Sequence, residues 1–235
     1  MNIALCMSGQ LRNVTDSFSK SIQSNLFDCN REHTINTFVH AWYDNTTVGT
    51  VYYASNDDPL HSPIGPPVAS SVVSDMYACY NPVKTLLQSQ IIFDDHMYTD
   101  RRMPGAIPRN GMSRLYSMYQ CNKLKSDHEQ ENGFEYDIVI NTRFDVILHA
   151  PIIFITLHNL HIHHLGYTSH GFNPLFVYGH SGTMNEYCTL YHYIAEVYAS
   201  GIRWCDEYLA DTFLKMRNIP IEDDAISTSL NRVPL

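Results

Sequence analysis

The chain has 235 residues, of which 44% are hydrophobic and 12% aromatic, and its formal net charge is −9. This length and apolar content suit a substantial core, and a single α/β domain over residues 1–235 is the simplest organisation. The acidic balance excludes a general nucleic-acid binder, because phosphate backbones require clustered Lys and Arg. A nucleotide-sized anion needs only a local basic patch. Six basic residues lie close together in the sequence and could form such a patch: Arg101, Arg102, Arg109, Arg114, Lys123 and Lys125. A solvated loop and helix face is the alternative explanation for such a group of charges.

The six cysteines lie in no CxxC pair and show no regular spacing. Several stand among apolar residues, so we expect reduced core thiols rather than disulfides or a zinc cluster. The first apolar run, Ile3 to Met7, is too short for a signal sequence, and no segment reaches the ~20 apolar residues of a membrane span. The sequence therefore predicts a soluble protein of the cytoplasm, or of the host cytoplasm if the source is a virus.

The first 42 residues predict a β-α-β unit. Ile3 to Met7 is typical of a short buried strand, and residues 8–12 (SGQLR) of a turn. An apolar stripe with a four-residue period predicts a helix over residues 15–27. Residues 34–42 (TINTFVHAW) mix β-branched and aromatic side chains, as a second strand does.

Loop chemistry dominates residues 43–70 and 94–108, and a loop as long as the first is usually functional. Between them we expect a helix over residues 70–80 and one or two strands over 83–93. Asn110 is a candidate cap for a long helix that ends at Gly133, and a strand to Asp145 follows. Strands are expected at 160–165 and 175–178, and helices at 184–198 and 205–217.

Residues 136–148 (YDIVINTRFDVIL) form an apolar run that ends in polar side chains. On a strand Asn141, Arg143 and Asp145 share one side. In open α/β sheets ligands bind beyond the carboxyl ends of the strands, where an Arg and an Asp suit a phosphate and a metal ion. The alternative is an Arg–Asp pair on the surface that closes the strand.

Three blocks in order, IALCMSGQLR, FVHAWYD and YDIVINTRFDV, resemble a group of viral and bacterial proteins related to nucleotide-sugar glycosyltransferases of the GT-A fold. The resemblance covers most of the chain from Ile3 to about Ile221. It implies a Rossmann-like α/β domain with a mainly parallel central sheet flanked by helices. It also implies transfer of a sugar from a nucleoside-diphosphate sugar to a glycan or other hydroxyl acceptor, as in polysaccharide biosynthesis.

In that fold an Asp-x-Asp motif ends a central strand, and its last Asp binds the metal that holds the donor diphosphate. Residues 143–145 (RFD) stand in that position, so Asp145 would bind Mn²⁺ or Mg²⁺. Arg143 replaces the first Asp and would contact the ribose or diphosphate as a second cation. This replacement puts the metal dependence in question.

The resemblance also implies where the donor binds. Ser8, Gly9 and Gln10, with Arg12 beyond them, would receive the base and phosphates, because a turn of small residues before a helix gathers N–H donors. An ordinary β-α turn is the alternative. Further contributions to nucleotide-sugar binding would come from His40, Trp42, Arg114 and Asn141. The structural alternatives are that Trp42 packs in the core beside a hydrogen-bonded His40, and that Arg114 forms a salt bridge on the surface.

Five histidines at positions 161, 163, 164, 170 and 180 suggest a zinc site. His161 and His163 would share a strand face, but a third ligand must come from elsewhere. A partly exposed, aromatic-rich surface explains the cluster better than zinc does, although one of His163, His170 or His180 would complete the metal shell of Asp145.

For the acceptor, Glu207 is the preferred catalytic base, with Asp206 second, although acids in a first helical turn also stabilise the helix dipole. Relatives carry an acid in the loop at 171–174, where this chain has Asn173 and Pro174. The alternatives to a glycosyltransferase are a non-catalytic nucleotide-sugar-binding protein of the same fold and a metal-dependent phosphoesterase that uses Asp145 and the histidines.

Overall fold

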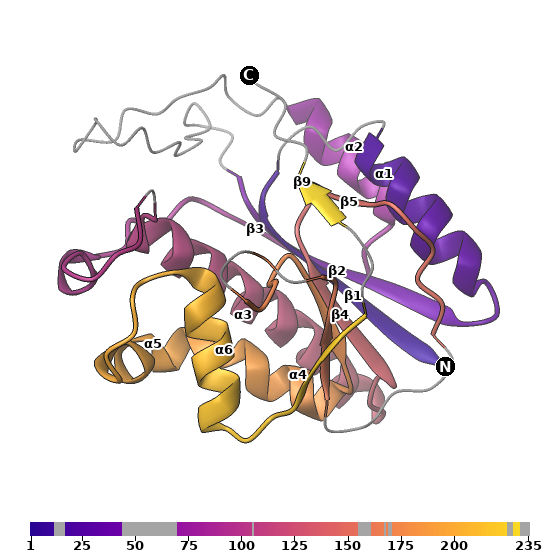
Figure 1. The fold of residues 1–235 in the computed structure, drawn as a ribbon. Coiled ribbons are helices and arrows are strands. Elements are labelled where there is room, and N and C mark those ends of the chain that lie inside the picture. The colour runs from indigo at the N-terminus through magenta and orange to yellow at the C-terminus, as the bar shows by residue number, and fades with distance from the viewer. Residues whose placement is uncertain are drawn as a thin grey trace.

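A seven-stranded sheet forms the centre of the molecule (Figure 1). The computed structural model describes residues 1–11, 17–43, 70–104, 106–154, 161–166, 168, 171–224 and 228–230. The strands of this sheet are β1 (Asn2–Gln10), β2 (Thr34–Trp42), β3 (Lys84–Gln88), β4 (Ile138–Thr142), β6 (Ile162–His164), β7 (Phe176–Gly179) and β8 (Ile221–Asp223). Their order across the sheet is β3-β2-β1-β4-β7-β6-β8, so β4 is the middle strand.

The sheet is parallel except at one strand. β3, β2, β1 and β4 pair in parallel, β7 pairs antiparallel with both β4 and β6, and β6 pairs in parallel with β8. Parallel strands covered on both faces require near-continuous apolar runs, and Ile138 to Ile140 in β4 supply one. The predicted α/β fold with a mainly parallel central sheet is confirmed.

Helices cover both faces of this sheet (Figure 1). One face carries α1 (Ser17–Ile22), extended by a π-helical turn (Gln23–Phe27), and α2 (Ser70–Tyr80), together with a two-stranded sheet of β5 (Val146–Leu148) and β9 (Thr228–Leu230). The other face carries α3 (Pro108–Asn132), α4 (Ser181–Cys188), α5 (Leu190–Ala199) and α6 (Asp206–Met216). We call these the α1/α2 face and the α3 face.

Alternating side chains of the strands supply a separate apolar core to each face. Cys6 and Val139 belong to the cluster on the α3 face, whereas Leu5 and Ile140 belong to the cluster on the α1/α2 face. This alternation follows from the two-residue period of an extended chain. The face on which any strand residue lies can therefore be read from its neighbours.

Most predicted elements are confirmed, and two of them, β2 and α2, have the predicted bounds. The turn predicted at residues 8–12 is wrong in its first half, because Ser8, Gly9 and Gln10 continue β1 and pair with β2 as far as Trp42. The loop predicted at 43–70 lies largely outside the described residues. Residues 94–108 contain a short 3₁₀ helix (His96–Tyr98), and Arg102 forms a β-bridge with Trp204.

Three other predictions need correction. The strand expected to reach Asp145 ends at Thr142, and residues 143–145 turn the chain toward β5 in the second sheet. Asn110 does not cap α3, which begins at Pro108 because proline suits the first helical turn. Gly133 does end α3, with a left-handed φ of 68°. The single helix expected at 184–198 is two helices, α4 and α5, and β8 and β9 were not predicted.

All six cysteines are free thiols, as expected, and four of them are buried. Within the described part of the chain, every helix is too short or too polar to cross a membrane.

Candidate functional site at the carboxyl edge of the sheet

The parallel strands end together at one edge. Ser8 lies opposite His40, Gln10 opposite Trp42, and Trp42 opposite Gln88. On the other side of β1, Met7 lies opposite Thr142, the last residue of β4. The polar residues at these strand ends therefore line a common edge, the usual ligand-binding edge of an open α/β sheet.

Arg143 and Asp145 form a two-pronged ion pair directly after the middle strand. Arg143 Nε donates to Asp145 Oδ1 at 2.8 Å, and Nη2 donates to Oδ2 at 2.6 Å. The side chain of Asp145 is only 4% exposed and that of Arg143 26% exposed. The predicted Arg–Asp pair exists, but it is largely buried, so its hydrogen bonds are less screened than those of a surface pair.

The surroundings of Asp145 do not fit a Mn²⁺ or Mg²⁺ ion. Both carboxylate oxygens accept from Arg143, whose positive charge would repel a cation there. These ions favour several oxygen ligands. Among the described residues, the single group of three His, Cys, Asp or Glu side chains close enough to hold a metal lies elsewhere and omits Asp145.

The end of β1 offers backbone rather than side chains. Gly9 has a φ of +119°, which strains any residue with a Cβ, and a Cβ placed on it would meet no heavy atom of the described residues within 4 Å. Glycine thus permits this conformation within β1 and leaves space beside the main chain that no described side chain fills. Ser8 is buried on the α3 face, and Arg12 lies outside the described residues.

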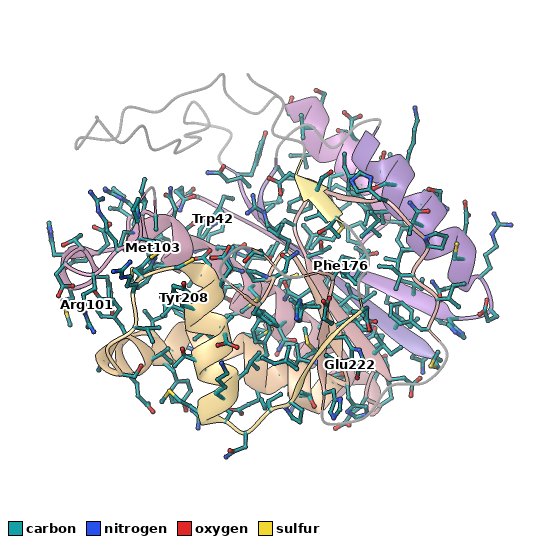
Figure 2. The ribbon with its side chains drawn as sticks, in the orientation of Figure 1. Trp42, Arg101, Met103, Phe176, Tyr208 and Glu222 are labelled. Atoms are coloured by element: carbon teal, nitrogen blue, oxygen red, sulfur yellow. The ribbon has the colours of Figure 1, made fainter. Side chains whose placement is uncertain are left out.

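His40 and Trp42 pack into the molecule. His40 Nδ1 lies 2.6 Å from Ser117 Oγ, and Nε2 lies 3.1 Å from Gln88 Oε1. Burial lowers the pKa of His40, so the ring is neutral at pH 7. Trp42 stacks on Tyr116 of α3 with ring centroids 5.5 Å apart and lies at the end of β2 (Figure 2). This geometry favours the structural explanation, because a ring stacked within the protein has little surface left for a base.

Arg114 of α3 pairs with Asp206 at the start of α6, with Nε and Oδ2 2.7 Å apart. Burial acts to lower the pKa of Arg114, but the charge and hydrogen bond of Asp206, with the nearby Tyr187 and Glu207, together outweigh it and the pKa is raised. The next residue, Glu207, accepts a hydrogen bond from the Cys205 thiol. Burial and that carboxylate raise the pKa of Cys205 to about 12. Both predicted base residues therefore have partners within the protein.

Gly111 lets α3 and α6 approach at this pair. A Cβ on Gly111 would lie 2.5 Å from Asp206 Oδ1 and 3.2 Å from the Trp204 ring. We expect Gly111→Ala to displace Asp206 from Arg114 and to lower the free energy of unfolding by about 1–3 kcal/mol, as overpacking does. Urea denaturation measures the change.

Gly182→Ala is the matched control for this substitution, because a Cβ on Gly182 in α4 would meet no atom of the described chain within 4 Å. Alanine stabilises a helix interior relative to glycine by up to about 1 kcal/mol, so this control should be neutral or stabilising. Equal effects of the two substitutions would show that the crossing of α3 and α6 does not depend on Gly111.

Two asparagines have local structural roles. Asn141 Nδ2 donates to Cys188 Sγ at 3.7 Å, on the α3 face. Asn173 Nδ2 donates to the Leu165 carbonyl at 2.8 Å, while its Oδ1 accepts from Leu175 N at 3.1 Å. A carboxylate accepts but cannot donate, so an acid at position 173 would lose the first of these bonds. The loop geometry thus accounts for the amide in place of the acid.

The predicted basic patch does not exist as a cluster of unpaired cations. Arg109 pairs with Asp95 and Arg114 with Asp206, and Lys125 is buried against Glu129. Arg101 lies over the Tyr198 ring and pairs with Asp100. These cations serve local contacts, and the guanidinium of Arg143 is the better candidate for an anion at the carboxyl edge.

The predicted histidine cluster is spread over different surroundings. His180 precedes α4, and His164 Nδ1 contacts the Gly166 carbonyl at 3.2 Å. His163 lies beside Glu222 and Asp224, whereas His170 is outside the described residues. Sequence reasoning missed both acids because it did not predict β8, which brings them to the histidine.

The sequence matches no protein-family model and no curated protein. The interpretation of the site therefore depends on its own chemistry and on its position in the fold.

Proposed function

We propose that this protein is a glycosyltransferase that moves a sugar from a nucleoside-diphosphate sugar to a hydroxyl of a glycan or similar acceptor. The observation that supports this proposal most is the Arg143–Asp145 pair, which directly follows the middle strand of a mainly parallel sheet. The open space beside Gly9, at the end of the adjacent strand, adds room for a ligand against the main chain.

The chemistry needs positive charge where the leaving group departs. Cleavage of the bond between the sugar and the diphosphate leaves negative charge on the diphosphate oxygens, and preorganised cations and N–H donors stabilise that charge. Arg143 is a planar fork of donors suited to phosphate, and Asp145 holds it in place. Arg143 would thereby supply the charge that a metal ion supplies in enzymes with an acid at this position.

The acceptor hydroxyl must lose its proton as the new glycosidic bond forms. Glu207 is the proposed base, because it is half-buried at the first turn of α6 and accepts only from a neutral thiol among its described contacts. Asp206 is less suitable, since its charge is neutralised by Arg114 at 2.7 Å.

A donor screen tests the proposal. A ligand that binds the folded state at a hundredfold excess over its dissociation constant stabilises the protein by about 2.7 kcal/mol, which raises the melting temperature measurably. We expect one nucleoside-diphosphate sugar to stand out, and the free nucleoside diphosphate to bind as well. Release of nucleoside diphosphate with a glycan acceptor, assayed with Mn²⁺ and with chelator, then measures turnover. Absence of any stabilising nucleotide sugar would refute the proposal.

A non-catalytic nucleotide-sugar-binding protein is the second candidate. The pairing of both possible bases, Asp206 with Arg114 and Glu207 with Cys205, favours it. Binding in the screen without turnover on any glycan acceptor would support this second function.

A further inference from the structure

The strand pair β6 and β8, which is separated from β4 by β7, gathers histidine and carboxylate side chains. His163 lies opposite Glu222 in the parallel pairing of these strands and opposite Tyr178 of β7. Tyr178 belongs to the apolar cluster of the α1/α2 face, and the His163 ring stacks on it with centroids 4.9 Å apart. His163 and Glu222 therefore lie on the face opposite Ser117, Arg114 and the other side chains of α3.

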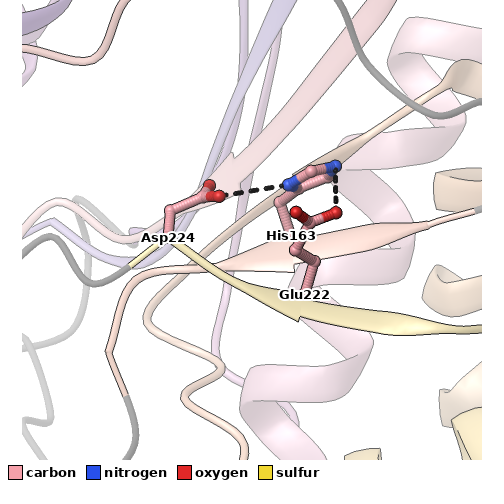
Figure 3. A group of neighbouring side chains, drawn as sticks. All are labelled: His163, Glu222 and Asp224. Atoms are coloured by element: carbon pink, nitrogen blue, oxygen red, sulfur yellow. Dashed lines mark hydrogen bonds and ion pairs between the residues drawn. The ribbon is translucent and has the colours of Figure 1, made fainter.

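The two ring nitrogens of His163 have different surroundings (Figure 3). Nδ1 lies 3.3 Å from Asp224 Oδ1, while Asp224 Oδ2 accepts a hydrogen bond from the Tyr178 hydroxyl. Asp224 is thus fixed as the acceptor for a proton on Nδ1. This places the lone pair of His163 on Nε2.

Among the residues that the structure describes, His163 Nε2 finds no hydrogen-bond partner although it is buried, and the side chain is only 7% exposed. The nearest acid is Glu222, whose Oε2 lies 3.8 Å from Nε2, too far for a hydrogen bond. Leaving a buried nitrogen unpaired costs about 1–3 kcal/mol. The lone pair on His163 Nε2 faces the Glu222 carboxylate across this gap. A cation bound between the two groups would give both of them a partner.

His161 provides a further nitrogen atom that can bind a metal ion, and it lies beside the Glu222 carboxylate. Its Nδ1 lies 3.1 Å from Glu222 Oε2, and its ring centroid is 6.4 Å from that of His163. The side chains of His161 and Glu222 are 34% and 46% exposed, so the group opens to solvent. An ion can reach it without unfolding, and water can fill a remaining coordination position.

We propose that His163 Nε2, Glu222 and His161 bind a divalent transition-metal ion of the Zn²⁺ class. Imidazole with carboxylate suits Zn²⁺ better than Mg²⁺ or Ca²⁺, which favour all-oxygen ligands. Ligand atoms around tetrahedral Zn²⁺ lie about 3.3 Å apart, so His163 Nε2 and Glu222 Oε2, which are 3.8 Å apart, need a shift of only ~0.5 Å. His161 lies outside the group of close ligand atoms and must rotate on its exposed side to reach the same ion. Asp224 is a positioning residue, because a carboxylate on Nδ1 fixes the tautomer that binds metal through Nε2.

Metal binding itself tests this site, with no reference to sugar transfer. Metal-free protein is titrated with Zn²⁺ by calorimetry and with Co²⁺ by visible absorption. We expect one equivalent of each to bind, with the visible bands of a four- or five-coordinate Co²⁺ ion. Thiolate charge-transfer bands should be absent, because the proposed ligands contain no cysteine.

Glu222→Gln and His161→Gln are the test variants, since both side chains are exposed enough to be replaced without unfolding the protein. Each should weaken Zn²⁺ binding by at least about tenfold. Replacing a residue that only hydrogen-bonds a metal ligand already costs this much, and these two side chains are proposed to bind the ion directly. Glu135→Gln and His96→Gln make the same changes at exposed sites elsewhere and should leave the affinity unchanged. Asp224→Asn tests the positioning role and should weaken binding by about 10–100-fold.

The proposal is overturned if the wild-type protein binds no Zn²⁺ or Co²⁺ stoichiometrically. It is equally overturned if Glu222→Gln and His161→Gln leave binding intact, or if Co²⁺ shows thiolate bands. Because these ligands include none of the residues proposed to hold the nucleotide sugar, loss of metal binding and loss of nucleotide-sugar binding are measured as separate results.

Discussion

Glu129→Gln should lower the free energy of unfolding by about 3–5 kcal/mol, because it leaves the buried Lys125 ammonium without its counter-charge. Lys125 has a fully buried side chain and donates to Glu129 Oε2 at 2.8 Å, to Ser181 Oγ at 2.7 Å and to Asn185 Oδ1 at 2.8 Å. All three of its N–H donors are therefore used. Glu129 Oε1 also accepts from Ser181 and from the main-chain N–H of Tyr136.

This network fixes where α3 ends and α4 begins. Lys125 and Glu129 are one turn apart on α3, Ser181 and Asn185 are one turn apart on α4, and Tyr136 leads into β4. Burial of each charge is tolerable only while the partner is present, since an isolated buried charge is strongly unfavourable. Urea denaturation of the folded protein measures the predicted loss.

Glu131→Gln is the matched control in the same helix. Glu131 pairs with Lys84 at 2.6 Å, but its side chain is 60% exposed, so its loss should cost less than about 1 kcal/mol. The double substitution Lys125→Met with Glu129→Gln should be less destabilised than Glu129→Gln alone, because it removes the orphaned charge. Equal losses for Glu129→Gln and Glu131→Gln would show that burial does not govern this pair.

Lys125 also illustrates which information the sequence lacks. In the sequence Lys125 belongs to the group of six basic residues between positions 101 and 125, and such a group is normally solvated. Its burial depends on α4, which follows more than 50 residues later and brings Ser181 to it. Side-chain burial by a distant element leaves no trace in local charge pattern, so the predicted basic patch was wrong for a physical reason.

Local signals succeeded where a single element satisfies them. The strand from Thr34 to Trp42 and the helix from Ser70 to Tyr80 have the predicted bounds, since runs of β-branched residues and the residues that stop a helix are properties of the local chain. Gly133 ends α3 because its left-handed conformation favours glycine. The middle strand was also located, although the turn at residues 143–145 was not.

The candidate sites depend on pairings that local patterns do not encode. The sequence placed Arg143 and Asp145 at the end of the right strand, but not their two-pronged bond to each other. Three-residue β8 is too short for a periodic signal, so Glu222 could not be assigned to the histidines of β6. A sequence that predicts strand ends well can still miss which side chains meet there.

Arg143→Ala should lower kcat/KM for sugar transfer by about 10²–10³-fold, the loss typical of removing one preorganised donor to developing charge. Nucleoside-diphosphate binding by calorimetry should weaken in parallel. Arg143→Lys keeps the charge but loses the planar fork of N–H donors, and it should recover only part of the activity.

Because Arg143→Ala leaves the buried carboxylate of Asp145 without this partner, the melting temperature of each variant is measured first. Arg217→Ala, which removes an Arg–Glu pair 3.1 Å long between α6 and α4, is the control and should keep full activity.

Asp145 decides between two mechanisms through a double-mutant cycle. If Asp145 acts by holding Arg143, then Asp145→Ala should lower kcat/KM. The double variant should then be little worse than Arg143→Ala alone, since the effects of substituting two residues that act as a unit do not add. The response to Mn²⁺ would then be the same in Asp145→Ala and the wild-type protein. If Asp145 instead binds a metal, Asp145→Ala should abolish Mn²⁺ stimulation while Arg143→Ala retains it. The two bonds between Arg143 and Asp145, at 2.6 and 2.8 Å, favour the first outcome, because that carboxylate would have to release the guanidinium before it could hold an ion.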